Sequence, residues 1–332
     1  MKNECEFRKF SFEDISYKPP VFQNADDKYA KLSLVDFYGV IFPEDNDRPY
    51  WFMIHSNPNK YRFSGVFKAG DSWNSVQQQV HLEDYPQKDA QIDEYQLVNN
   101  EYYRIASKQP YSEIVIKEDC ASIRITDSLN LEAKYFPFAI IKHMDDTMDV
   151  AQVTQTVEVS GTFDGKQVKG LGNVEFCYIP EEETRNLNDF WSYIYAYDCG
   201  IREDGKKEFA MVRFSLNGGS TGIYWLEGNE PVISNDVSME AKWHPLPYEQ
   251  ETCCYKDAVW KFADKEIHFS GRWGHKGLTA YPRMSLNGQS QIMGDWYEGS
   301  KPYKHSVSMT FHENMDVYAD KLREGGFEVE SL

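Results

Sequence analysis

Residues 157–197 combine an acidic side chain, strand glycines and a row of aromatic rings. Gly170 and Gly172 precede Glu175 in a strand-like run, and glycines inside a strand mark a bulge or a close approach of two backbones. A strand glutamate most often faces solvent, because acidic side chains are rarely buried. If Glu175 instead faces an aromatic cavity, desolvation raises its pKa, and its carboxyl group can then act as a general acid or base near neutral pH.

Four aromatic residues at alternate positions follow this segment: Trp191, Tyr193, Tyr195 and Tyr197. In a β-strand all four rings lie on one face. Such a row either packs as ordinary core or lines a ligand cavity. Three tyrosines favour the cavity, because each buried hydroxyl group needs a hydrogen-bond partner and a dry core is built more simply from Phe or Leu. We therefore predict that Glu175 is catalytic and that the four aromatic residues bind the substrate.

A second aromatic and acidic patch lies in the last third of the chain. Trp296 and Glu298 flank Tyr297, and Trp243 lies upstream of them. We expect Trp243, Trp296 and Glu298 to contact the ligand as well. Glu175 and Glu298 could also form the carboxylate pair of a glycosidase. Because nothing in the sequence fixes their separation, a carbohydrate-active protein is a weaker alternative.

The sequence lacks the motifs of metal, redox and nucleotide chemistry. Its eight histidines form no H-E-x-x-H or H-x-H pattern, and its six cysteines form no C-x-x-C pair. It has no P-loop and no G-x-G-x-x-G segment. Residues 218–222 match the letters G-x-S-x-G, but they lie between strand patterns and do not open a helix, so we do not expect a nucleophile elbow there. Residues 145–149 are rich in aspartate but lack the glycine and glutamate of a calcium loop, so we expect a solvated turn. We predict neither a metal nor a cofactor.

Composition and charge narrow the classes of partner. The net charge of −18, from 53 acidic and 35 basic residues, argues against nucleic acid and against an anionic membrane surface. The first ten residues carry charges throughout, and no stretch of 18 apolar residues occurs, so we expect neither a secretory signal nor a membrane span. Six sparse cysteines favour free, mostly buried thiols in a reducing compartment. We expect a soluble cytoplasmic protein with a neutral or apolar small-molecule partner, and the sequence leaves the oligomeric state open.

Strand patterns dominate the chain. Residues 112–126 and 153–159 alternate apolar and polar side chains. Turn dipeptides such as Asp164-Gly165 recur at short intervals and predict hairpins, and the glycine-rich residues 218–222 have the composition of a hairpin loop. A short helix is expected at 318–323, before two glycines.

The domain boundary is expected where Gly, Asn, Pro, Ser and Asp cluster, at residues 228–237. This division gives an N-terminal domain of residues 1–232 and a C-terminal domain of residues 233–332. The second is short for a barrel, so it could borrow a strand from the N-terminal region.

The motifs resemble those of the AttH-like and hydroxyneurosporene synthase (carotenoid hydratase) group. That group's motif, G-x-G-Y-x-D followed by a W-x-W strand, is similar to residues 170–175 and Trp191-Ser192-Tyr193, with Asn173 and Glu175 in place of the aromatic residue and the aspartate. Shorter likenesses lie at residues 38–43, 240–243 and 291–299. Some lipocalin-like Diels–Alderases look like further relatives.

The resemblance implies an all-β fold of two antiparallel lipocalin-like (calycin) barrels in tandem, with few short helices. It also implies an acid that protonates an alkene at the position of Glu175, with Asn173 among the substrate-binding residues. We therefore predict a cofactor-free hydratase, isomerase or cyclase acting on an apolar unsaturated substrate, such as a terpenoid, a polyketide or a lipid-like molecule. The alternative is a binding or carrier protein for a hydrophobic ligand, in which the same cavity serves without any need for Glu175.

Overall fold

The computed structural model forms two compact units. The first comprises Met1–Lys68 and Gln79–Arg185, and the second comprises Ala69–Gln78 and Asn186–Leu332. The structure describes residues 4–11, 32–45, 48–57, 61–74, 78–86, 92–98, 102–107, 112–143, 151–178, 193–215, 218–246, 249–276, 290–299, 305–315 and 319–330.

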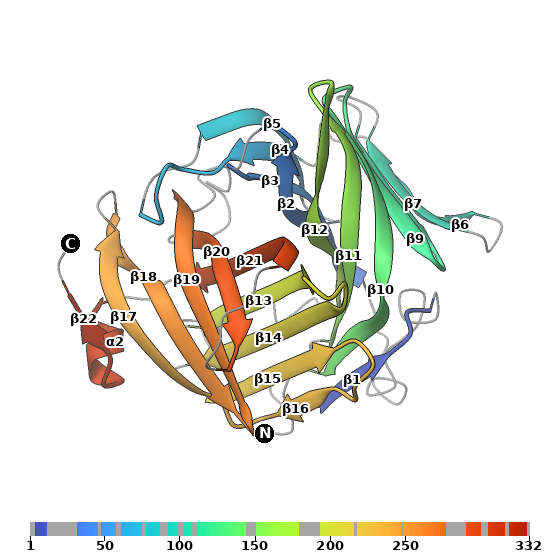
Figure 1. Cartoon of the computed structure of the whole chain (residues 1–332). Helices are drawn as coiled ribbons and strands as arrows, with labels where there is room; N and C mark the ends of the chain where they lie inside the picture. Colours follow the sequence, from blue (N-terminus) through green and yellow to red (C-terminus); the bar gives the residue numbers. More distant parts are fainter. Residues whose placement is uncertain are drawn as a thin grey trace. The chain divides into compact units, whose positions relative to one another are not determined.

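The first unit is built on one antiparallel sheet of twelve strands. Its strands are β1 (Glu4–Arg8), β2 (Leu32–Pro43), β3 (Tyr50–Asn57), β4 (Tyr61–Lys68), β5 (Gln78–Pro86), β6 (Ile92–Val98), β7 (Tyr102–Ser107), β8 (Ser112–Lys117), β9 (Cys120–Ile125), β10 (Leu129–His143), β11 (Ala151–Phe163) and β12 (Lys166–Tyr178). Their order is β5-β4-β3-β2-β12-β11-β10-β9-β8-β7-β6, and β1 pairs with β10. The pairing of β12 with β2 therefore joins two segments that are far apart in the sequence (Figure 1).

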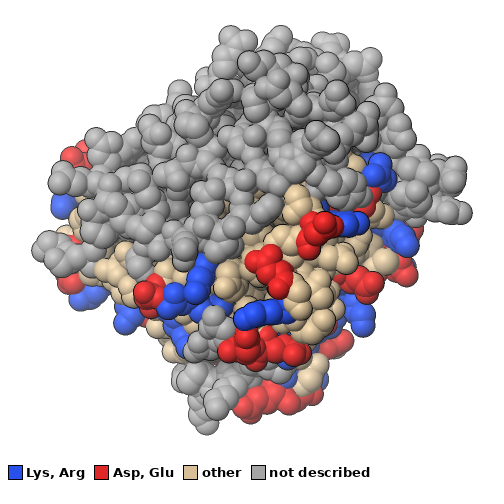
Figure 2. All heavy atoms as spheres, turned by 90° about the horizontal axis from the view of Figure 1, so that it is seen from above, with Lys and Arg blue, Asp and Glu red and all other residues tan. Residues whose placement is uncertain are grey.

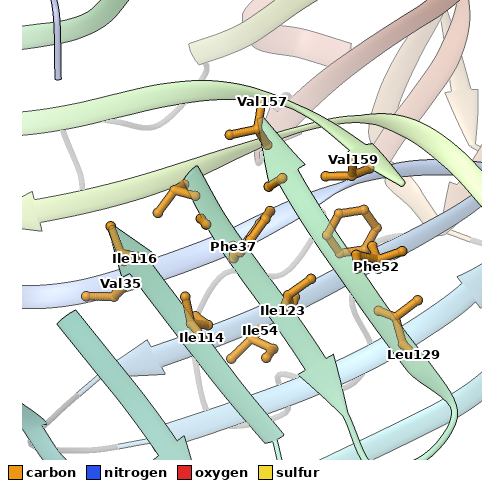
Figure 3. Close-up of a cluster of buried hydrophobic side chains, with 14 of the residues drawn as sticks. Val35, Phe37, Phe52, Ile54, Ile114, Ile116, Ile123, Leu129, Val157 and Val159 are labelled. Carbon is orange, nitrogen blue, oxygen red and sulfur yellow. The ribbon is translucent and has the colours of Figure 1, made fainter. Parts of the chain in front are cut away.

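The core of this unit lies on one face of the curled sheet. Alternate residues point to opposite faces of a strand, and Phe37 of β2 and Ile54 of β3 share a single apolar cluster with Ile114 and Ile116 of β8 (Figure 3). Each such side chain, when fully buried, contributes about 1.5–3 kcal/mol. The curl of the sheet lets β2 and β3 share this core with β8 and β9, as in a lipocalin-like barrel.

Glycines allow β2 and β12 to approach closely. A Cβ atom at Gly172 would lie 2.4 Å from the carbonyl oxygen of Tyr38, and one at Gly39 would lie 2.3 Å from that of Leu171. Gly170 is tighter still, because a Cβ atom there would lie 1.8 Å from the carbonyl oxygen of Val40. The glycines before Glu175 therefore mark a close approach of two backbones, which is one of the two roles that the sequence predicted.

The second unit is built on a sheet of ten strands. Its elements are β13 (Tyr193–Arg202), β14 (Lys207–Ser215), β15 (Gly218–Leu226), β16 (Val232–Ser234), β17 (Ser238–Leu246), β18 (Glu249–Phe262), β19 (Lys265–Lys276), β20 (Ser290–Glu298), β21 (His305–Met315), α2 (Ala319–Glu324) and β22 (Glu328–Val329). The order is β16-β15-β14-β13-β21-β20-β19-β18-β17-β22, and among the described strand pairings of this sheet only the short β17–β22 pairing is parallel. This sheet also curls (Figure 1).

The core of the second unit is rich in aromatic rings. Trp243, Tyr255, Trp260, Phe269 and Trp296 are fully or almost fully buried in one cluster. The Trp243 and Tyr255 rings meet edge to face, with centroids 5.0 Å apart, a favoured geometry for aromatic pairs. Residues of β13–β15 contribute to the same cluster, so the curl of this sheet also encloses its core.

The nearly all-β fold agrees with the sequence analysis, and so do several of its details. The Asp164-Gly165 turn has φ angles of 46° and 76°, as a type I′ hairpin requires. Helix α2 ends before Gly325 and Gly326, and Gly326 has a φ angle of 84°.

Residues 145–149 lie outside the described part of the chain. The expected boundary segment, 228–237, contains β16, which pairs with β15.

One element was predicted wrongly. Residues 218–222 begin strand β15 instead of forming a hairpin loop. Their glycine content has a packing cause at Gly222, because a Cβ atom there would lie 2.4 Å from the ring of Phe262. The sequence pattern shows small residues, but it does not show which ring lies above them.

A segment from the first half of the chain belongs to the second unit. Gly70 N donates to Gly274 O at 3.0 Å, and Gly274 N donates to Ser72 O at 2.8 Å. The Trp73 ring packs on His244 of β17, with centroids 5.2 Å apart. Within the described residues this segment, 69–74, forms no strand, although its neighbours along the chain, β4 and β5, are strands of the first sheet.

Charged side chains of both signs lie next to one another on the described surface (Figure 2). Lys261 contacts Glu240 at 2.7 Å, and Lys166 contacts Asp45 at 2.8 Å. Each of these exposed pairs lowers the pKa of its acid through a hydrogen bond from the lysine. No described helix is long and apolar enough to cross a membrane.

Candidate functional site

Four polar side chains form a row across the first sheet. Strand register places Thr154 of β11 opposite Glu175 of β12, Glu175 opposite Asp36 of β2, and Asp36 opposite His55 of β3. Direct register partners share a face. This face is opposite the core, because the neighbouring residues in each strand, such as Phe37, belong to the apolar cluster.

The row is buried, and its members form two contacting pairs. Glu175 is 6% exposed, Asp36 is 6% exposed and His55 is 7% exposed. Thr154 Oγ1 donates a hydrogen bond to Glu175 Oε1 at 2.9 Å, and His55 Nδ1 lies 2.8 Å from Asp36 Oδ1. A strand glutamate most often faces solvent, but Glu175 does not.

A second polar row lies two residues further along the same strands. Thr156 Oγ1 donates to Asn173 Oδ1 at 3.0 Å, and Asn173 Nδ2 donates to the hydroxyl oxygen of Tyr38 at 3.3 Å. These bonds fix the orientation of the amide, because its oxygen accepts and its nitrogen donates. Asn173, which replaces the aromatic residue of the resembled motif, thus holds the ring of Tyr38 on the adjacent strand.

The same face becomes apolar beyond these two rows. Leu171, Val40, Trp51 and Phe67 are successive register partners on β12, β2, β3 and β4. All four are buried, and the rings of Trp51 and Phe67 pack with centroids 5.3 Å apart. Polarity therefore falls along this face, from the row with Glu175, Asp36 and His55, through the row with Asn173 and Tyr38, to the apolar row.

The predicted aromatic row lies on the other sheet. Tyr195 and Tyr197 occupy one face of β13, with ring centroids 6.2 Å apart, and Tyr195 contacts Met211 Sδ at 3.4 Å. Both tyrosines are buried, on the face opposite the core residue Ala196. Tyr193 begins β13, and Trp191 lies outside the described residues. Glu175 belongs to β12 of the first unit and the tyrosines belong to β13 of the second, so no single sheet brings them together.

The remaining predicted site residues also lie in the second unit. Trp243 and Trp296 are part of its aromatic core, and Trp296 Nε1 donates to the carbonyl oxygen of Cys199 at 3.4 Å. Glu298 ends β20, is partly exposed, and lies 3.9 Å from Lys265 Nζ. The carboxyl groups of Glu175 and Glu298 are thus on different sheets. Their use as a glycosidase pair stays a prediction.

The described residues contain no group of three or more side chains placed to hold a metal ion. Five cysteines are free thiols, Cys5, Cys120, Cys199, Cys253 and Cys254, and the last three of them are buried. Burial raises the pKa of Cys253 to about 11, and it raises the pKa of Cys254 further. Thiols in such surroundings are poor nucleophiles because little thiolate forms.

Sequence reasoning missed two members of the acid row, Asp36 and His55. They lie more than a hundred residues before Glu175 and join it only through the β12–β2 and β2–β3 pairings. A usable signal was present in residues 35–41, where Asp36 interrupts a strand that is otherwise apolar or aromatic. A lone acid in a strand buried on both faces is expensive unless it is paired.

The fold places this chain among all-β proteins built from two lipocalin-like sheets. A protein provisionally named AttH, from Nitrosomonas europaea, matches it with a TM-score of 0.51 at 10% sequence identity, over 84% of this chain and 91% of that one. Kievitone hydratase from Nectria haematococca matches with a TM-score of 0.39 at 10% identity, over 87% and 89%. No protein-family model and no curated protein sequence matches the chain. The resemblance to AttH-like proteins is thus confirmed at the level of the fold.

Proposed function

We propose that this protein is an enzyme that acts on an apolar unsaturated small molecule by proton transfer from Glu175. The observation that carries the proposal is the burial of Glu175 in a polar row beside Asp36 and His55. Burial disfavours the charged form of a carboxyl group, and perturbed acids gather at functional sites more often than in ordinary sheets. A general acid that protonates carbon has to hold its proton near neutral pH.

The surroundings of Glu175 fit an apolar substrate. The hydroxyl group of Thr154 fixes one carboxyl oxygen, which orients the acid. The apolar row that includes Val40 and Trp51 lies on the same face, two residues beyond Asn173 and Tyr38. A hydrocarbon chain packed along that row would place its double bond near the acid. Hydration, isomerisation and cyclisation all begin with such a protonation, and none of them needs a cofactor.

A carrier of hydrophobic ligands is the second candidate, and the buried Tyr195–Tyr197 pair favours it. These rings lie on the face of β13 opposite the core, where aromatic side chains could contact an apolar ligand. A carrier needs no proton donor. The two candidates therefore differ in one property: the enzyme needs the proton of Glu175 for turnover, and the carrier does not.

The test is turnover of geraniol, farnesol and squalene in D2O, followed by mass spectrometry. We expect deuterium to enter at least one of these substrates, and Glu175→Gln to slow the reaction by about 10²–10⁴-fold, the usual contribution of a general acid. Ligand binding, followed by quenching of tryptophan fluorescence, should survive in the variant because Gln keeps the size of the side chain.

The matched control is Glu132→Gln, which changes an exposed glutamate of β10 in the same sheet and should leave turnover unchanged. Binding without deuterium incorporation would support the carrier. Equal turnover in Glu175→Gln and wild type would eliminate the acid role. If none of the three molecules binds or reacts, the proposed substrate class is wrong.

A further inference from the structure

The sheet of the second unit has a polar row of its own. Strand register places Tyr195 of β13 opposite Arg213 of β14, and Arg213 opposite Thr221 of β15. Direct register partners share a face, and Val212, the neighbour of Arg213, belongs to the core cluster on the opposite face. Tyr195, Arg213 and Thr221, which we call the Arg213 row, therefore lie side by side and face away from that core.

The Arg213 row carries hydrogen-bonding groups suited to an anion. Thr221 is fully buried, and its Oγ1 has no hydrogen-bond partner among the described residues, which is costly for a buried hydroxyl group. The Tyr195 hydroxyl donates to Met211 Sδ at 3.4 Å, and sulfur is a weak acceptor. Arg213 is partly buried. Its guanidinium has five N–H donors, so it can bind an anion in addition to contacts within the protein.

The same face becomes apolar beyond the Arg213 row. Two further rows of register partners follow along the same three strands, and all of their residues are buried: Tyr197, Met211 and Ile223, then Cys199, Phe209 and Trp225. Among the described residues of these three rows on β13–β15, Arg213 alone carries a charge. The last row is four residues further along each strand, about 14 Å from the first. The face thus combines one cation with a long apolar stretch.

We propose that this face binds an amphiphile with an anionic head group, a carboxylate or a phosphate, and a long apolar tail. The head group contacts the guanidinium of Arg213, whose planar fork matches both anions, and accepts a hydrogen bond from Thr221. The tail lies along the two apolar rows. The inference goes beyond the proposed enzyme and does not depend on Glu175, which belongs to the other sheet.

The neighbouring charges place the anion at Arg213. Lys207 lies on the same face at the other end of β14, but it neighbours Glu227 of β15, whose backbone nitrogen donates to Lys207 O at 2.9 Å. Arg213 instead has a residue with a hydroxyl group on each side. The nearest acid along its row is Glu313 of β21, the other register partner of Tyr195. Its backbone is two strand spacings from that of Arg213, about 10 Å.

The first experiment compares head groups on one tail. Isothermal titration calorimetry at pH 8 measures binding of dodecanoate, dodecyl phosphate and dodecanol to the full chain. We expect at least one anion to bind about tenfold or more tightly than dodecanol, because hydrogen bonds between charged groups are stronger than neutral ones. The tighter of the two anions identifies the head group. Equal affinity for all three molecules, or no binding of either anion, would overturn the proposal.

The second experiment changes the row. Arg213→Gln should weaken anion binding by about 10–100-fold and leave dodecanol binding unchanged, and Thr221→Val should weaken anion binding by about 2–10-fold. Glu313→Gln should strengthen it, because a negative charge leaves the row. If Arg213→Gln keeps the anion affinity of the wild type, or lowers the affinity for all three molecules equally, Arg213 does not bind the head group.

Lys207→Gln is the matched control, because it removes a cation from the same strand and face, and it should leave anion binding unchanged. Arg213→Lys keeps the charge without the fork, so it should retain part of the affinity even if Arg213→Gln unfolds in a urea titration. Glu175→Gln should bind dodecanoate as the wild type does. Loss of anion binding alongside Glu175-dependent turnover of farnesol would refute only the present inference. Anion binding without any such turnover would refute only the proposed enzyme.

Discussion

At the scale of single residues, burial determines which groups can ionise. Tyr255 lies in the aromatic core of the second unit, between Trp243 and Trp260. Burial raises the pKa of its phenol well above the ordinary value, and the charge of Asp198 adds to the shift. A phenol whose pKa is raised on folding stabilises the native state below its unfolded pKa, near 10, and this contribution is lost as the pH rises toward the folded pKa.

Tyr255→Phe should therefore flatten the alkaline side of the stability profile. In the wild type, Tyr255 alone should lower the free energy of unfolding by about 1.4 kcal/mol per pH unit above pH 10. The variant lacks the phenol, so its free energy of unfolding should not fall by this amount. Urea unfolding at pH 8 and pH 11 measures the difference. The other buried groups with raised pKa, such as Cys254, remain in both proteins and cancel. Equal losses in the two proteins would show that Tyr255 can ionise without unfolding.

The candidate site shows what a sequence can and cannot reveal about residues. Glu175 could be found because glycines precede it, and those glycines have a cause in the close approach of β12 to β2. The alternation of Tyr195 and Tyr197 also fixed their shared face. Asp36 and His55 could not be placed beside Glu175, because alternation gives the face of a strand but not its partner strand or register.

At the scale of elements, one hairpin carries backbone strain. Ala263 connects β18 to β19 with a φ angle of 50°, and Phe262 pairs with Lys265 on either side of the turn. The left-handed conformation costs a non-glycine residue about 1–2 kcal/mol. The fold tolerates this conformational cost because a two-residue connection between the two long strands requires positive φ.

Ala263→Gly should stabilise the protein by up to about 1 kcal/mol. The steric cost disappears, although the greater freedom of glycine in the unfolded chain removes part of the gain. Denaturant unfolding measures the change. Asp264→Gly is the control in the same turn. Its φ is not positive, so glycine adds unfolded-state freedom, and it also removes the contact of the Asp264 carboxylate with Lys265 Nζ at 3.1 Å; this variant should therefore destabilise the protein. A loss of stability in Ala263→Gly would mean that the turn has another conformation in solution.

Elements also show where pattern reasoning has a physical limit. Strands with strict alternation, such as β8 and β11, were predictable because one face had to be apolar. Strand β15 was not, because it begins with two glycines, and its third glycine, Gly222, leaves the space that the ring of Phe262 occupies. A glycine selected by a neighbouring ring has the same sequence signature as a glycine selected by a turn.

At the scale of the whole molecule, the chain enters the second unit twice. Residues 69–78 belong to that unit, while β4 and β5 on either side belong to the sheet of the first. The sequence suggested that the second domain could borrow a strand. The structure instead shows a docked segment that is held by two backbone hydrogen bonds to Gly274 and by the packing of Trp73 on His244. Among the described residues, this segment has two backbone hydrogen bonds to Gly274, whereas the long neighbouring strands are paired along their length, so we expect it to open before those strands.

Gly274→Ala should release this segment without unfolding either sheet. A Cβ atom at position 274 would lie 2.0 Å from the carbonyl oxygen of Trp73, and backbone cannot yield as a flexible side chain can, so both hydrogen bonds have to break. Hydrogen–deuterium exchange of the peptide around residues 69–74 should speed up by about tenfold or more, which corresponds to a loss of about 1.4 kcal/mol in opening free energy. Exchange in β2 and β12 should not change, and Ser72→Ala, which keeps the backbone, serves as the control. Unchanged exchange at residues 69–74 would mean that the segment is not docked on Gly274 in solution.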